Sequence, residues 1–278
     1  MSRTDRRFSG WAIGATIAML TIKATVITLF VIASQASGDE PTGDAAGTSV
    51  LVRAGKPDEQ ARRTYLGRIV AEPMGHQGAS WLVRPERETE ENVDKAFQHL
   101  GIQADMVVCD LGCGNGYWTL PMARAVGEQG TVYAVDIQPQ MLRLLRTRAG
   151  KAKVNNVVPV LGTVDDPKLP ADAKVDMVLL VDVYHEFSHP ESMLWCIRES
   201  LAPDGVISLL EYREEDVNVP IKPLHKMSKP QIMKEYTANG FKLVREFNDL
   251  PWQHLMFFAR DDSPLESIEP VPFKPAAP

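Results

Sequence analysis

Cysteine is scarce in this chain of 278 residues, which contains only Cys109, Cys113 and Cys196. An odd number of thiols without a Cys-x-x-Cys pair fits neither a paired disulfide framework nor a thiolate metal site. Cys109 falls in an expected buried strand and Cys113 in a glycine-rich loop, where a disulfide would distort the turn. We therefore expect three free thiols.

Basic residues are not in excess either. The chain has 30 Lys and Arg against 36 Asp and Glu, which gives a formal net charge of -6. Nucleic-acid binding uses clustered Lys and Arg, and no such stripe is present, so we expect no nucleic-acid partner. The hydrophobic content of 44% is enough for the core of one sizeable domain with appendages.

One long apolar run lies near the N-terminus. Three arginines precede an apolar stretch over residues 11–33, and small residues follow it. This order is typical of a signal peptide cleaved after Ala36, although the run is also long enough for a retained membrane anchor. We expect residues 1–36 to be one of these two. By the positive-inside rule, either one exports the folded domain to the periplasm or the exterior, with membrane contact only through an uncleaved segment.

The rest of the chain divides by composition. Residues 37–57 are small and polar, as in a flexible linker. Residues 58–260 have the pattern of a folded domain, and residues 261–278 are rich in Pro and predict a loose tail. Within the domain, residues 58–105 predict an N-terminal helical and lid region.

This N-terminal region contains two expected helices around a loop. Residues 58–72 can be helical, and a Gly-punctuated loop runs through residues 74–82. Residues 86–100 have an acidic first turn and apolar positions at helical spacing, and Gly101 is expected to end that helix.

Strands and helices then alternate. Apolar strands are expected over residues 106–110, 131–136, 157–161, 175–181 and 206–211, and helices over residues 118–126, 139–148 and 191–201. A helix over 229–239 is followed by strands over 241–247 and 254–260, whose connection is too short for a parallel crossover. The pattern predicts an α/β fold: a doubly wound, mostly parallel seven-stranded sheet that ends in an antiparallel hairpin.

The first strand of this sheet runs into the most informative stretch, Asp110-Leu111-Gly112-Cys113-Gly114-Asn115-Gly116. Glycines let the backbone turn sharply and approach a nucleotide-like ligand, and the following helix presents free N–H groups. Asp136 ends the next strand 24 residues after Gly112, a separation at which a carboxylate meets ribose hydroxyls in dinucleotide-type sites. A carboxylate ahead of the glycines opposes a pyrophosphate but suits an ammonium or sulfonium group.

With its acid-x-Gly-x-Gly-x-Gly motif and terminal hairpin, the chain resembles the class I S-adenosylmethionine-dependent methyltransferases over roughly residues 90–260. The resemblance implies S-adenosylmethionine as cofactor. Its implied cofactor-binding residues are Asp110, Gly112, Cys113, Gly114, Gly116, Asp136, Ile137, Asp165 and Asp182. The first five would hold the methionine end and Asp136 the ribose. Asp165 would contact the adenine amine, although Thr163 stands where many members have that acid.

The resemblance also places the substrate pocket after the strand over 175–181, where Asp182, Tyr184, His185 and Glu186 follow. The protein must position the nucleophile and, where it carries a proton, accept that proton. His185 is the candidate base and Glu186 the group that could orient it. A loop histidine that caps the next helix is the other interpretation of His185.

Other polar residues are expected to matter less. His76, with Trp81 and residues 84–87, could form a lid. His225 and His254 are interpreted as structural or at the substrate rim, and the histidines lack the close spacing of a zinc site, so no metal is expected. Residues 212–227 form either a substrate-facing insertion or a solvated loop.

The sequence therefore predicts an exported S-adenosylmethionine-dependent methyltransferase that acts on a small acceptor. A nicotinamide-dependent oxidoreductase and a non-catalytic binding protein with the same fold are the alternatives. The sequence does not identify the acceptor atom or the oligomeric state.

Overall fold

The computed structural model describes residues 63–274. The predicted signal peptide or anchor and the linker lie outside the described residues, as does the first part of the helix expected from residue 58. Within residues 63–274, every helix is too short or too polar to cross a membrane.

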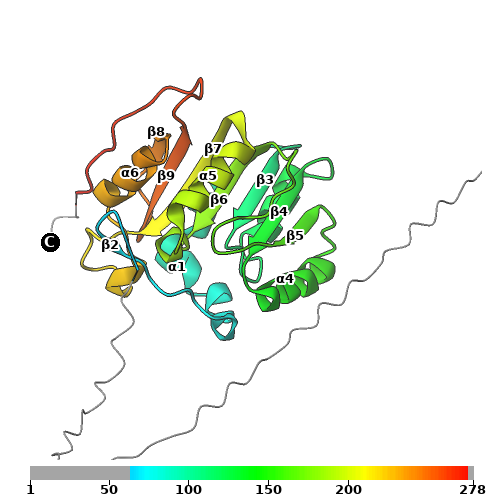
Figure 1. Cartoon of the computed structure of the whole chain (residues 1–278). Helices are drawn as coiled ribbons and strands as arrows, with labels where there is room; N and C mark the ends of the chain where they lie inside the picture. The colour runs from blue at the N-terminus through cyan, green and yellow to red at the C-terminus, as the bar shows by residue number, and fades with distance from the viewer. Residues whose placement is uncertain (1–62, 275–278) are drawn as a thin grey trace, which may run out of the picture. The chain divides into compact units, whose positions relative to one another are not determined.

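A seven-stranded sheet forms the centre of the domain, in the spatial order β5-β4-β3-β6-β7-β9-β8 (Figure 1). Its strands are β3 (Val107–Leu111), β4 (Thr131–Asp136), β5 (Val157–Leu161), β6 (Val175–Val181), β7 (Leu201–Tyr212), β8 (Phe241–Phe247) and β9 (Gln253–Arg260). Strands β3 to β7 are parallel, whereas β9 pairs antiparallel with both β7 and β8. The predicted fold class is confirmed.

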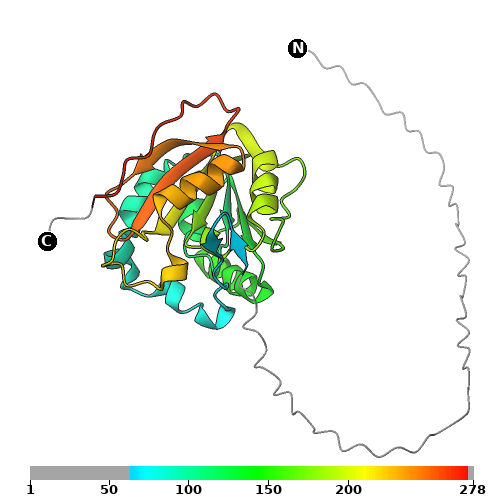
Figure 2. The ribbon, with the colours of Figure 1, turned by 60° about the vertical axis from the view of Figure 1, so that its left-hand side comes forward.

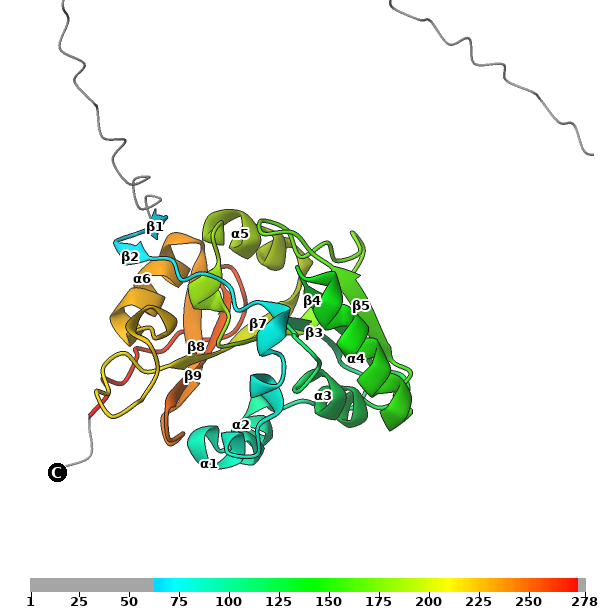
Figure 3. The same ribbon diagram turned by 90° about the horizontal axis from the view of Figure 1, so that it is seen from below.

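Helices cover both faces of this sheet because its strands are apolar on both sides. On β4, Val132 and Ala134 pack with α3 (Thr119–Val126) and α4 (Pro139–Ala152). Val135 points to the other face, where the core includes side chains of α5 (Pro190–Ser200) and α6 (Lys229–Ala238). Figure 3 shows α5 and α6 on one side of the sheet and α3 on the other.

The described start of the domain differs from the expected helix over residues 58–72. Residues 63–72 contain a two-stranded hairpin of β1 (Thr64–Tyr65) and β2 (Arg68–Ile69). Leu66 and Gly67 both have positive φ, 46° and 98°, so the chain turns back between the strands. The prediction of a helix is wrong for these residues, because Gly67 is the only residue in the sequence that indicates the turn.

The helix expected over residues 86–100 is present as two helices, α1 (Arg87–Glu91) and α2 (Val93–Leu100). Asn92 separates them with a left-handed backbone, and its side chain accepts a hydrogen bond from the Lys95 amide of α2. Asparagine tolerates this conformation and caps helices well, which explains the break. The expected end at Gly101 is confirmed, with φ 75°.

The C-terminal segment is not loose over its described residues. The Ile268 amide donates to the Leu243 carbonyl at 2.8 Å, and the Val271 amide donates to Glu246 at 2.7 Å. Figures 1 and 2 show this red segment beside β8. Because β8 is an edge strand with unpaired backbone groups, the segment covers part of an edge that would otherwise be free to pair.

Candidate active site

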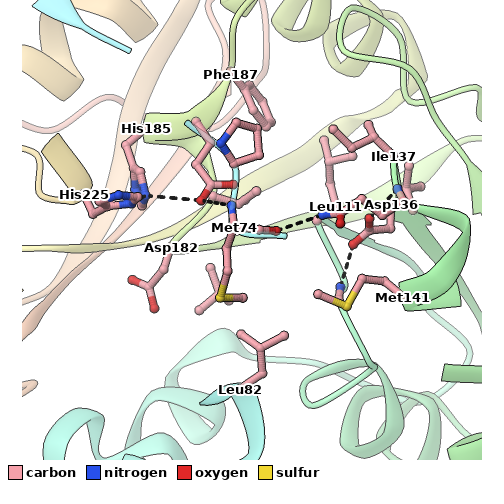
Figure 4. A pocket seen from close by; sticks show the side chains of 18 of the residues that line it. Met74, Leu82, Leu111, Asp136, Ile137, Met141, Asp182, His185, Phe187 and His225 are labelled. Atoms are coloured by element: carbon pink, nitrogen blue, oxygen red, sulfur yellow. Dashed lines mark hydrogen bonds and ion pairs between the residues drawn. The ribbon is translucent and has the colours of Figure 1, made fainter. Parts of the chain in front are cut away.

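A cavity of about 470 Å³ lies beyond the carboxyl ends of β3, β4 and β6 (Figure 4). Open α/β sheets bind their ligands at this edge, because the loops that follow neighbouring strands meet there. Of the residues expected from the sequence, the cavity is lined by Gly112, Gly114, Asp136, Ile137, Asp182, His185 and Glu186. The structure therefore brings these seven of the expected site residues to one cavity.

The glycine loop approaches the cavity with a backbone that only glycine adopts easily. Gly112 and Gly114 have φ values of 78° and 53°. A Cβ on Gly112 would lie 2.5 Å from Val183 Cγ2, and one on Gly114 would lie 2.6 Å from Leu82 Cδ1. At both positions the positive φ and the neighbouring Val183 or Leu82 exclude a side chain. Only glycine therefore fits, as in loops where the backbone comes close to a ligand.

Asp136 connects this loop to the next strand. Its Oδ2 accepts a hydrogen bond from the Gly114 amide at 2.9 Å, and its Oδ1 accepts one from the Gln138 amide at 2.8 Å. Burial raises the pKa of the Asp136 carboxyl, and these backbone donors oppose that shift. Ile137 is exposed beside it and also lines the cavity, so this part of the wall offers a carboxylate next to an apolar side chain.

The other predicted loop residues support the cradle from behind and do not line the cavity. Asp110 is buried and accepts a hydrogen bond from the Thr119 hydroxyl at 2.5 Å. Burial raises its pKa to about 7. A Cβ on Gly116 would lie 2.3 Å from Leu145 Cδ1. Cys113 is buried, and all three cysteines are free thiols, as expected.

Asp165, the expected adenine contact, lies on an exposed loop outside the cavity lining. Its Oδ1 accepts a hydrogen bond from the Thr163 hydroxyl at 2.6 Å, which lowers the pKa of the Asp165 carboxyl. Thr163 and Val164 line the cavity instead. The structure favours the solvent-exposed turn for Asp165 and places Thr163 at the cavity wall.

His185 is 2% exposed and lies at the cavity edge after β6. Its Nδ1 is 2.7 Å from Glu211 Oε2, and its backbone amide donates to Glu211 Oε1 at 3.2 Å. Burial lowers the pKa of the imidazole, but Glu211 and the neighbouring acids outweigh burial and the net shift is upward. A carboxylate on Nδ1 leaves Nε2 as the reactive atom.

The orienting carboxylate is therefore Glu211, not Glu186 as the sequence suggested. Glu211 lies near the end of β7, which neighbours β6 in the sheet, and it is fully buried. An acidic residue near the end of an apolar strand was the available signal, because neighbouring parallel strands end at the same edge.

Glu186 and His225 lie on the other side of the imidazole. His225 Nδ1 is 3.1 Å from His185 Nε2, and Glu186 Oε1 is 4.0 Å from the same atom. Burial raises the pKa of Glu186 to about 7, and burial together with His185 lowers the pKa of His225. The histidines lack close spacing in sequence, as expected, but His185 and His225 meet in the fold although they are 40 positions apart.

The N-terminal hairpin fixes the backbone of His185. Arg68 Nη1 donates to the His185 carbonyl at 2.8 Å, and the Ala71 amide donates to the same oxygen at 3.1 Å. The Arg68 guanidinium is itself held by Glu235 of α6 through hydrogen bonds of 2.7 and 2.9 Å. A segment outside the sheet thus positions the candidate base.

Asp182 belongs to a second buried network at the cavity wall. Gln253 Nε2 donates to both of its oxygens at 2.9 Å, and Arg87 lies 3.7 Å away. Arg87 also pairs with Glu91 at 2.6 Å, and Glu91 accepts a hydrogen bond from the Tyr212 hydroxyl at 2.8 Å. Burial raises the pKa of the Asp182 carboxyl well above its usual range, and the negative charge of Glu91 adds to this shift. The sequence did not reveal these partners.

Two loops complete the cavity. Met74, Trp81, Leu82 and Arg87 line it from the segment expected to be a lid, and Pro220, Ile221, Lys222 and His225 line it from the segment after β7. With Tyr212, five positions of the segment 212–227 line the cavity, in line with the substrate-facing interpretation.

Two residues that the sequence singled out are structural. Tyr184, expected at the substrate pocket, is instead buried against Tyr236 and Phe187. His254 is buried with its Nε2 2.9 Å from Glu215, in line with the structural interpretation.

Comparison with known proteins adds the family. A family model described as a methyltransferase domain matches residues 102–255. The chain is 38% identical over 66 residues to a demethylmenaquinone methyltransferase of Shouchella clausii, covering 24% of this chain and 28% of that protein. It is 27% identical over 151 residues to a ubiquinone/menaquinone biosynthesis C-methyltransferase of Shewanella baltica, covering 54% of this chain and 55% of that protein.

Among solved structures, the fold matches an S-adenosylmethionine-dependent methyltransferase from Aquifex aeolicus with a TM-score of 0.63. The identity is 22%, and the match covers 67% of this chain and 98% of the other. The family model spans more than half of the chain, and the mostly parallel seven-stranded sheet with its antiparallel end strands matches the fold of the solved methyltransferases. The chain therefore belongs to the class I, Rossmann-like, S-adenosylmethionine-dependent methyltransferases.

Proposed function

We propose that this domain transfers the methyl group of S-adenosylmethionine to a small, largely apolar acceptor that carries an ionisable hydroxyl. The observation that carries the proposal is the His185–Glu211 pair at 2.7 Å, which lies on the same cavity as the glycine loop and Asp136. An imidazole oriented by a buried carboxylate is a common arrangement for activating a nucleophile.

The residues of the cofactor half fit S-adenosylmethionine. At the cradle, Gly112 and Gly114 expose the backbone on the cavity wall without a side chain, which lets a cofactor come close to it. Asp136 and Ile137 would hold the ribose and the adjoining base, and Thr163 and Val164 would border the adenine. When bound, the cofactor supplies a methyl group on a positively charged sulfur, which is a good electrophile.

The acceptor half combines an apolar wall with a basic end. Leu82, Val183, Phe187, Met193 and Ile221 contribute apolar surface, and His185 and His225 lie together at one side. Apolar burial would supply most of the acceptor's affinity, and the polar groups would set its orientation. His185 Nε2 would accept the hydroxyl proton while Glu211 stabilises the imidazolium.

One relative is named for demethylmenaquinone, so a quinone-like ring with a free hydroxyl is the first acceptor to test. We also propose that residues 1–36 export the enzyme or tether it to the membrane, which places the acceptor search among compounds outside the cytoplasm.

The test uses the full chain. Calorimetry should show binding of S-adenosylhomocysteine and no binding of NAD. Labelled methyl transfer from S-adenosylmethionine to a panel of hydroxylated rings should then fall about 100-fold or more in His185→Gln. His99→Gln, at a partly buried histidine outside the cavity lining, is the control and should retain full activity.

Failure to bind S-adenosylhomocysteine would contradict the proposed function. Normal binding with no transfer to any acceptor would favour the alternative of a non-catalytic binding protein.

A further inference from the structure

Three side chains with metal-binding atoms converge at one end of the cavity. His185, Glu186 and His225 each offer one ligand atom, and these atoms all lie within 4.8 Å of one another. Figure 4 shows His185 and His225 side by side at the cavity edge. Two imidazoles and one carboxylate are a donor set that zinc, iron and other divalent transition metals accept.

The separations suit a common ion. Metal–nitrogen bonds of about 2.1 Å would turn the 3.1 Å between His185 Nε2 and His225 Nδ1 into an angle of about 95° at the ion. The 4.0 Å from His185 Nε2 to Glu186 Oε1 corresponds to a wider angle of about 145°, which a small rotation of the carboxylate would reduce. All three atoms lie within 4.8 Å of one another, and two bonds of about 2.1 Å span about 4.2 Å, so a side-chain rotation that draws Glu186 toward the histidines would complete the site.

Hydrogen bonds outside the cluster hold the ligands ready. Glu211 Oε2 is 2.7 Å from His185 Nδ1, so the Nε2 lone pair is directed to the cavity side. A carboxylate on the far nitrogen of a ligand histidine is the usual support of such a site, because it fixes the tautomer and strengthens the donor. The Met74 amide donates to Glu186 Oε1 at 3.1 Å, and Arg68 holds the His185 carbonyl.

The charges also favour a cation. Glu186 has 14% of its side chain exposed, and among residues 63–274 its ion-pair contact within 4.0 Å is with His185. Burial, His185 and Lys222 lower the pKa of His225, and Lys222 lines the same cavity, so one positive charge on this side opposes the cation. Glu211 is fully buried beside it. Two carboxylates that face two imidazoles in a poorly solvated cavity gain more from a divalent ion than from one proton.

We propose that His185, Glu186 and His225 bind one divalent transition-metal ion, with zinc as the reference ion, and that its open positions face the cavity. The role of this ion rests on the proposed function. The hydroxyl oxygen of the acceptor binds the ion at an open position, and the hydroxyl proton is released to water. No other bond is made or broken in that step. His185 then acts as a ligand, and the ion takes over activation of the acceptor.

Metal binding by the full chain tests the site without any turnover. Protein freed of metal by a chelator is titrated with Zn²⁺ in a calorimeter and with Co²⁺ in a visible spectrometer. We expect one ion per chain and a cobalt spectrum typical of nitrogen and oxygen ligands. His225→Ala and Glu186→Gln should each weaken binding by more than about 100-fold, and Glu211→Gln by about 10–100-fold. His99→Ala is the control and should leave the affinity unchanged.

Binding that is absent, or that survives both His225→Ala and Glu186→Gln, would overturn the metal proposal. S-adenosylhomocysteine binding, measured on the same samples, separates this failure from that of the proposed function. A chain that binds S-adenosylhomocysteine but no metal would keep its methyltransferase assignment, with His185 as the proton acceptor.

Discussion

The two halves of the cavity are built in different ways. Most of the cofactor half comes from one continuous stretch, residues 107–137, which contains β3, the glycine loop and β4, and Thr163 and Val164 join it from the loop after β5. The acceptor half joins distant segments: His185 meets Glu211 and His225, which are 26 and 40 positions away, and Arg68 pairs with Glu235 across 167 positions.

This difference teaches where each function resides. Backbone conformation and local spacing shape the cofactor half, so a short motif describes it. The acceptor half depends on buried side-chain pairs between segments, and these can change while the sheet stays the same. We expect mutations to separate cofactor binding from acceptor chemistry along this division.

The largest effect should come from the support of the acceptor half. Arg68→Met leaves the Glu235 carboxylate buried without its partner, so we expect a loss of about 3–5 kcal/mol in the free energy of unfolding. The double variant Arg68→Met/Glu235→Leu removes both charges and should recover most of the lost free energy of unfolding. Affinity for S-adenosylhomocysteine, measured where the variants remain folded, should stay unchanged. Weaker cofactor binding in the double variant would mean that the halves are coupled.

A glycine change should damage the cofactor half alone. In Gly112→Ala the added Cβ meets Val183 at 2.5 Å and φ is 78°, so we expect affinity for S-adenosylhomocysteine to fall about 100-fold. Gly127→Ala is a matched control, because Gly127 has φ 71° with no atom within 4 Å. Both variants should lose roughly 1–3 kcal/mol from the backbone, because Gly127, with ψ -174°, lies in a region that essentially only glycine adopts, while Gly127→Ala keeps its affinity. Equal affinity losses would rule out the steric explanation.

A pH effect should follow from Asp110. Its folded-state pKa of about 7 lies above its unfolded value, so the folded state binds the extra proton between about pH 4 and pH 7. The contribution to stability is full below pH 4 and is lost as the pH rises through 7. We expect Asp110→Asn to reduce the fall in unfolding free energy across this window by about 4 kcal/mol. The matched control is Asp172→Asn at an exposed position, which should leave the fall in unfolding free energy as it is. An unchanged fall in Asp110→Asn would contradict the view that Asp110 causes it.

The smallest effect should come from Asp165. Because its side chain is exposed and bonded to Thr163, Asp165→Asn should change the Kd of S-adenosylhomocysteine by less than about twofold. Asp136→Asn, which weakens the acceptor for two backbone amides, should raise that Kd about tenfold or more. A large effect of Asp165→Asn would restore the adenine contact that the sequence suggested.

Sequence patterns predicted the sheet well because its strands are apolar, short and separated by clear helices. They failed where a few residues decide the geometry. Leu66 and Gly67 turned an expected helix into a hairpin, and Asn92 divided another helix in two. Tyr184 was assigned to the pocket from its place after β6, but the structure buries it in the core.

By itself, the sequence determined the α/β class, the glycine cradle and Asp136, because these depend on periodicity and on contacts close along the chain. Only the tertiary structure decided that Glu211 orients His185 and that His225 and Glu186 join it. Sequence spacing carries no information about such pairs, because they form where the ends of β6 and β7 and the loop after β7 meet. The chemistry proposed for the acceptor therefore depends on the folded chain, whereas the cofactor could be predicted from its motif.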